Sequence, residues 1–160
     1  MPPIALLLTL AAAVPFIACG LAAVGQSPEP AARMLAALID YAALMLAFSG
    51  GMYWALVLLP GAPEGSPTPG RGAQARLAAS AVPVLLAWAA LISTRWMPSW
   101  ISLGILIGGY VVTLLMERHA GLHAALPRQH VWIRWGFTLV AVAMMTTVLV
   151  LRLFGRTIVF

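Results

Sequence analysis

The sequence predicts an all-α integral membrane protein, a five-transmembrane-helix bundle in which residues 1–160 form a single membrane domain. Three observations predict this class. Hydrophobic residues make up 62% of the chain and charged residues only 8%, whereas a soluble domain carries about 25% charged residues because its surface faces water. The apolar residues form long blocks without the alternation of a transmembrane barrel. Residues that favour turns separate these blocks.

Each block is long enough to cross a bilayer, because a span needs about 20 mostly apolar residues. A helix is expected for each, since in lipid every segment must satisfy its own backbone hydrogen bonds. The first block has no charged residue, the second contains Asp40, and the fifth ends near Arg152. We expect the spans at about residues 4–24, 34–59, 77–94, 97–116 and 135–153.

The connections between the blocks predict how the chain lies in the membrane. Residues 60–72 contain four Pro and four Gly, which indicates a flexible loop. Residues 117–134 form the longest polar region, with Trp132 near its end at the depth that aromatic residues favour. A weak excess of Arg on the side of the first residue predicts a cytoplasmic N-terminus by the positive-inside rule. Abundant Ala, Gly, Pro and Arg, with no Asn, are typical of a GC-rich bacterium, so we expect the bacterial inner membrane.

Two short similarities indicate an internal repeat. Pro15 and Pro83 lie within the first and third blocks, and Gly pairs lie within the second and fourth. The order predicts two repeated helical hairpins followed by a fifth helix, an arrangement found in some transporters. The alternative is chance, because Ala, Val, Pro and Gly are common in this chain.

Asp40 is the strongest candidate for an intramembrane polar site. It lies about 9 Å along the helix axis from the start of the second block, where an acid costs a few kcal/mol unless it is paired or wetted. It shares a helix face with Ala47, Gly51 and Trp54, and we expect this face to point into the bundle. Arg95 ends the third block on the same side of the membrane, so the two groups could pair. A proton or cation site is one interpretation; a structural ion pair is the favoured one.

The segment around the first Gly pair is the most distinctive of the chain. Ser49, Tyr53 and Trp54 flank Gly50 and Gly51, and could line a pocket with polar tips and aromatic faces. The favoured alternative is close helix packing, which small residues allow. The same packing role, within the chain or between copies, is predicted for Gly104, Gly108 and Gly109.

Metal and cofactor sites are not expected. His119 and His123 are spaced to share a helix face, but they lack a metalloprotease pattern and a Cys partner, and solvated interfacial residues are the simpler interpretation. The chain has one Cys, which excludes an internal disulfide framework. No catalytic triad, phosphate loop or nucleotide fingerprint is present, and no basic run indicates nucleic acid.

Several of these features together resemble a family of uncharacterised bacterial and mitochondrial membrane proteins that includes mammalian transmembrane protein sixty-nine. The resemblance covers most of the chain and rests on Val14-Pro15-Phe16, on residues 48–54, and on Val82-Pro83 with Trp88. The family pattern implies a His two residues after the first Gly pair, where this chain has Tyr53. That departure argues against a reaction that depends on His there. The resemblance implies an architecture and no established activity.

Three functions remain compatible with the sequence. The favoured one is a non-enzymatic accessory or assembly subunit of a larger membrane complex, because the loops are short and several helix faces carry small residues that allow close contact with another helix. The alternative is a small-molecule or ion carrier or channel that acts as an oligomer and uses the repeat and Asp40. A quinone- or lipid-binding membrane protein is a further alternative. The expected partners are the lipid bilayer and other membrane subunits or a second copy of the chain.

Overall fold

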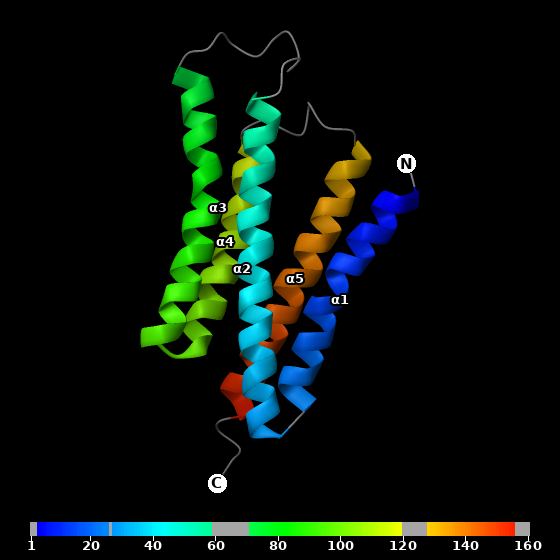
Figure 1. The fold of residues 1–160 in the computed structure, drawn as a ribbon, viewed down its shortest axis with the longest axis vertical. Coiled ribbons are helices and arrows are strands. Elements are labelled where there is room, and N and C mark those ends of the chain that lie inside the picture. The colour runs from blue at the N-terminus through cyan, green and yellow to red at the C-terminus, as the bar shows by residue number, and fades with distance from the viewer. Residues whose placement is uncertain (1–2, 26, 59–70, 120–127, 156–160) are drawn as a thin grey trace.

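The structure is a computed structural model that describes the backbone of residues 3–25, 27–58, 71–119 and 128–155, and the side chains within these helices of residues 7–25, 27–51, 80–118 and 132–154. The described residues form five α-helices in an up-and-down arrangement (Figure 1). They are α1 (Pro3–Gly25), α2 (Pro28–Leu58), α3 (Arg71–Trp96), α4 (Ser99–His119) and α5 (Arg128–Gly155).

The helices form a closed ring with a contact across its middle. Each helix packs against the next one along the chain, α5 returns to pack against α1, and α2 also contacts α4. The start of α1 and the end of α5 lie at opposite ends of the bundle (Figure 1). An odd number of antiparallel helices produces this arrangement.

Local signals in the sequence account for the tight connections. Ser27 precedes α2 and its carbonyl accepts a hydrogen bond from the N–H of Ala31 at 3.1 Å, while Pro28 takes the first helical position, where its missing N–H costs nothing. Residues 97–98 alone join α3 to α4. There the N–H of Met97 donates to the carbonyl of Ser93 at 2.8 Å, and the N–H of Ile101 donates to the carbonyl of Pro98 at 3.0 Å.

Four of the helices contain segments long and apolar enough to cross a membrane among the residues described. These segments are Leu7–Gly25, Pro28–Gly51, Ser99–Arg118 and Trp132–Phe154. The apolar segment described in α3, Ser80–Trp96, is shorter. Large apolar side chains are exposed all along the outside of the bundle, including Leu8, Leu21, Leu85, Trp88 and Leu139. Such a surface is compatible with lipid and not with water, because buried and lipid-facing residues are equally apolar only in a membrane protein.

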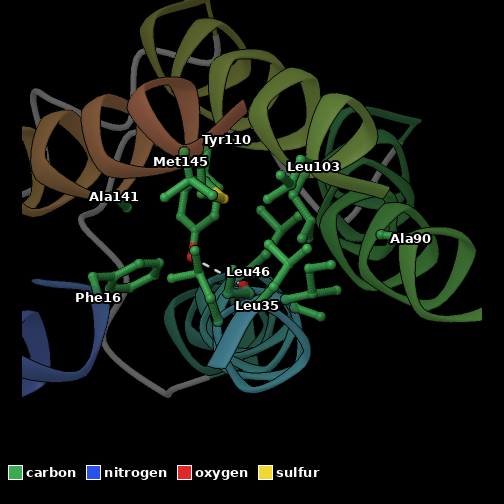
Figure 2. Close-up of a cluster of buried hydrophobic side chains, with 14 of the residues drawn as sticks. Phe16, Leu35, Leu46, Ala90, Leu103, Tyr110, Ala141 and Met145 are labelled. Atoms are coloured by element: carbon green, nitrogen blue, oxygen red, sulfur yellow. Dashed lines mark hydrogen bonds between the residues drawn. The ribbon is translucent and has the colours of Figure 1, made fainter. Parts of the chain in front are cut away.

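All five helices contribute to the core, α2 with the most residues, and most of its side chains are small or medium-sized (Figure 2). Leu38, Leu46, Leu103 and Leu106 are fully buried, and alanines of α2 and α3 fill the space between them. Because alanine brings helix backbones close together, the helices approach each other without large voids.

Two glycines of α2 and α4 lie close to neighbouring helices. A Cβ atom at Gly50 of α2 would lie 2.7 Å from the carbonyl oxygen of Ser80 in α3, and one at Gly109 of α4 would lie 2.7 Å from Cδ2 of Leu46 in α2. Real Cβ atoms do not approach heavy atoms so closely. At Gly50 the obstacle is backbone, so glycine is required there if α2 and α3 are to keep this spacing, whereas at Gly109 the obstacle is the end of a leucine side chain, which can shift.

Candidate functional site

Polar side chains of the bundle interior lie on one face of α4. Buried residues recur along this helix at intervals of three or four positions, which is the spacing of a single helix face. The inner face of α4 is made of its buried residues, which are Ser102, Leu103, Leu106, Gly109, Tyr110, Thr113 and Glu117. Four of these seven residues have polar side chains, and they extend from the first turn of the helix to the last.

The charged end of this face forms an ion pair with α5. A carboxylate oxygen of Glu117 lies 2.5 Å from a guanidinium nitrogen of Arg134, and the two side chains are 7% and 20% exposed. Next to this pair, the guanidinium of Arg118 stacks over the ring of Trp135, 5.2 Å from its centroid. The two contacts join the last turn of α4 to the first turns of α5, on opposite sides of a connection that the sequence presents only as a polar region.

Two tyrosine hydroxyl groups, one on this face of α4 and one on α2, donate hydrogen bonds to backbone carbonyls of neighbouring helices. Tyr110 of α4 donates to the carbonyl of Ala42 in α2 at 3.0 Å, and the dashed line in Figure 2 marks this bond. Tyr41 of α2 donates to the carbonyl of Ala12 in α1 at 2.7 Å. Pro15 of α1 has no N–H to donate, so the carbonyl that it leaves without its helical partner is that of Ala11, one residue before the acceptor of Tyr41.

Phe16 is the centre of an aromatic cluster that joins four helices. Its ring meets Tyr41, Tyr110 and Phe137 edge to face, with centroid separations of 5.1, 6.5 and 5.6 Å. Phe16 is fully buried. Edge-to-face contacts of this kind contribute about 0.5–1.5 kcal/mol each beyond the burial of area, so the cluster stabilises the contact of α1 with α2, α4 and α5.

At the other end of α4, the hydroxyl groups of Ser102 and Ser93 lie 2.7 Å apart across the contact with α3. Ser93 also reaches the carbonyl of Ala90 in its own helix at 2.7 Å. Thr113 similarly bonds to the carbonyl of Gly109 at 2.7 Å. Each polar side chain on the inner face of α4 therefore has a hydrogen-bond or ion-pair partner within the protein. Most of these bonds connect α4 to another helix, so their role is structural.

Asp40 and Arg95 lie elsewhere. Both side chains are exposed on the outside of the bundle, and neither forms an ion pair among the residues that the structure describes. The expectation of an inward face is wrong for Asp40 and Gly51, which are exposed, whereas Ala47 of the same face is half-buried and packs against the core. Larger residues one position away, above all Ile39, face α2's neighbours instead, because they bury more area against those helices than an acid and a glycine would.

The two glycines of the first Gly pair point to different sides of α2. Gly50 packs against α3, whereas Gly51 is exposed and has no heavy atom within 4 Å of an added Cβ. Ser49 is half-buried and donates to the carbonyl of Leu46 at 2.7 Å within its own helix. The side chains of Tyr53 and Trp54 lie outside the described residues, so a pocket there stays a prediction.

The second group of glycines divides in the same way. Gly109 packs against α2 and α3, whereas Gly104 and Gly108 face outward with no heavy atom within 4 Å of an added Cβ. A packing role for these two glycines would thus require a contact outside the chain. Among the described residues, no group of three or more His, Cys, Asp or Glu side chains is arranged to hold a metal ion.

Sequence reasoning missed the residues that the structure brings together. It treated Glu117 and Arg134 as the ends of one polar region and gave Tyr41 and Tyr110 no partner. One signal was present. Tyr110, Thr113 and Glu117 are separated by three and four positions in an otherwise apolar helix, which places three polar groups on one face.

An all-helical bundle with four long apolar helices, an apolar exterior and internally paired polar groups defines a membrane protein. Residues 1–150 match the family described as Protein of unknown function (DUF3429), and the chain belongs to this family. No curated protein and no solved structure matches the chain.

Proposed function

We propose that this chain is a non-enzymatic subunit of a larger membrane complex, and that it binds a partner in the plane of the membrane through the outer face of α2. The carrying observation is Asp40. This acid belongs to the apolar segment Pro28–Gly51, yet its side chain is exposed on the outside of the bundle. Leu44 and Phe48, on the same side of α2, are 64% and 68% exposed.

An unpaired carboxylate at this position is costly. An ionised side chain within a span costs a few kcal/mol, and such residues normally face a bundle interior, a water-filled cavity or a pairing group. The described part of the chain offers Asp40 no ion pair. A neighbouring helix that brings Arg or Lys to the depth of Asp40 would remove this cost, and Leu44 and Phe48 would add apolar contact area around the pair.

The interior of the bundle supports the same proposal. Its serine, threonine and tyrosine hydroxyl groups bond to one another or to backbone carbonyls, and Glu117 pairs with Arg134. These groups hold the helices together, so they are committed to the fold. Asp40 lies in a described apolar segment and forms no ion pair with the described residues. We therefore infer that its partner lies outside the bundle.

We further propose that all five helices cross the bilayer, with the N-terminus on the cytoplasmic face of a bacterial inner membrane. α3 packs between α2 and α4 and runs antiparallel to both (Figure 1), which supports a fifth crossing although its described apolar segment is short. Reporter fusions to the two termini test this topology. We expect a cytoplasmic reporter to be active only at the N-terminus and a periplasmic reporter only at the C-terminus.

Capture of the partner by light-activated cross-linking tests the accessory role. A photoreactive residue in place of Leu44 is expected to give a specific protein adduct in cells, and Asp40→Leu is expected to abolish it. The matched control is the same photoreactive residue in place of Leu139 of α5, which is 71% exposed on another helix. That position should give lipid adducts or none.

Two outcomes would reject the proposal. In the first, the Leu44 adduct persists in the Asp40→Leu variant while the purified variant keeps the thermal stability of the wild type. In the second, the purified protein alone supports a flux across liposomes that Asp40→Asn abolishes, which would favour the carrier alternative.

A further inference from the structure

A small cavity opens at the end of the bundle opposite to the Glu117–Arg134 pair. It has a volume of about 90 Å³ and lies between α2, the start of α4 and the end of α5. Four of its eight lining residues are leucines, of which Leu103 is buried and Leu153 is 48% exposed. Arg152 contributes the charged group of the wall. The cavity therefore combines one cation with an apolar surface that continues toward the outside of the protein.

Within the part of the chain that the structure describes, the guanidinium of Arg152 is only weakly satisfied. It donates one long hydrogen bond, 3.5 Å, to the carbonyl of Ala23, although a guanidinium carries five N–H donors. Two of the described acids are paired with other arginines: Glu29 with Arg33, and Glu117 with Arg134. Arg152 forms no ion pair with the other residues described, so its guanidinium has N–H donors left with which to bind an anion.

The surroundings of Arg152 select the kind of anion. Leu149 and Leu153 line the cavity one turn and one residue away from Arg152, and would repel a strongly hydrated free ion. Trp100, also on the wall, is 48% exposed and belongs to the residue type that favours the headgroup depth of a bilayer. A phospholipid has both parts that the cavity accommodates, an anionic phosphate and an acyl chain.

We propose that this cavity binds the phosphate group of an anionic phospholipid of the surrounding membrane. Arg152 donates to the phosphate oxygens in the forked geometry that guanidinium groups prefer. Ser99, the first residue of α4 and part of the wall, lies where the free N–H groups of a helix start favour the same negative charge. Leu149 and Leu153 contact the beginning of an acyl chain.

Lipid retention by the purified full-length protein tests this site. The protein in mild detergent is mixed with phosphatidylglycerol or with phosphatidylcholine, and bound lipid is counted by native mass spectrometry. We expect one phosphatidylglycerol to be retained in preference to phosphatidylcholine. Arg152→Gln should weaken this retention about fivefold, the factor that corresponds to about 1 kcal/mol for one basic residue near an anionic membrane surface.

The control variant is Arg33→Gln, which removes the same charge from an exposed position outside the cavity. It should retain phosphatidylglycerol as the wild type does. Arg152→Lys keeps the charge and should retain more lipid than Arg152→Gln; equal thermal stability of the variants shows that all are folded. An excess of inorganic phosphate should not displace the lipid.

Three results would overturn the proposal. Unchanged phosphatidylglycerol retention in folded Arg152→Gln protein would remove Arg152 from the site. Equal retention of the two lipids would show that no anion is recognised. Complete displacement by inorganic phosphate would assign the cavity to a free anion.

Discussion

Two neighbouring residues of α2 face opposite environments. Tyr41 turns inward, where its hydroxyl donates to α1 at 2.7 Å and its ring meets Phe16. Asp40 turns outward and forms no ion pair among the described residues. Both are polar residues in the same apolar segment, but only Tyr41 contributes to closing the bundle. The comparison teaches that a polar residue within a span can serve either the fold or a contact outside it, and that the packing of the helix decides which.

The inner and outer faces of α4 repeat this division. The inner face carries the paired polar groups and Gly109, whereas Gly104 and Gly108 are exposed. If the comparison is correct, substitutions on inner faces should change the free energy of unfolding, and chemically identical substitutions on outer faces should not.

The largest effect is expected from Glu117→Gln. Removing one member of a buried ion pair leaves the other charge uncompensated and costs about 3–5 kcal/mol. We expect a loss of this order in the free energy of unfolding, measured by denaturant titration in detergent. Glu29→Gln, which breaks an exposed pair of the same type with Arg33, should cost about 0.5 kcal/mol or less.

A double variant, Glu117→Gln with Arg134→Gln, sharpens this result. It should lose less stability than the sum of the two single variants, because no charge then remains buried alone. Strict additivity would show that the two groups do not depend on each other.

Matched glycine substitutions are expected to have the next largest effect. Gly50→Ala places a methyl group against the backbone of α3 and should cost about 1–3 kcal/mol, and Gly109→Ala should cost less, because the leucine side chain that it meets can shift. Gly51→Ala and Gly108→Ala add the same methyl group to outer faces and should be neutral or stabilise the helix by up to about 1 kcal/mol. Thermal unfolding of the four variants measures the difference in stability. If Gly51→Ala lost as much stability as Gly50→Ala, or Gly108→Ala as much as Gly109→Ala, the inner and outer faces would not differ as proposed.

The smallest effect is expected from Tyr110→Phe and Tyr41→Phe. Each removes one hydroxyl and keeps the aromatic ring in the Phe16 cluster. Hydrogen bonds between helices of membrane proteins contribute about 0.6 kcal/mol on average, so each variant should lose about that amount. Tyr110→Leu removes the ring as well and should lose several times more. If Tyr110→Phe lost as much free energy of unfolding as Tyr110→Leu, the hydroxyl and not the ring would make the main contribution to stability.

The helices were predictable from the sequence, but their rotations were not. Apolar blocks bounded by Pro, Gly and Arg indicate helices because a chain within lipid has no other way to satisfy its backbone. The side that faces the core is a different matter, since lipid and core attract apolar residues equally. Asp40 was therefore expected on the inside, where α2 presents Ile39 and Tyr41 instead.

The site was hidden for a related reason. Charged residues between 117 and 134 resemble a loop in the sequence, because charge usually marks water. In the structure α4 continues to His119 and α5 begins at Arg128, so Glu117 and Arg134 belong to helices. Their pairing depends on the contact between α4 and α5, and no spacing along the chain encodes it.

The tyrosine contacts have a consequence for how the sequence can change over evolutionary time. Their acceptors are the main-chain oxygens of Ala12 and Ala42, which any amino acid at those positions would also supply. Drift in the accepting helix therefore leaves the bond intact wherever the new side chain fits the space. The donors are the constrained side of these two bonds, because a single nucleotide change that replaces either tyrosine by phenylalanine removes its hydroxyl.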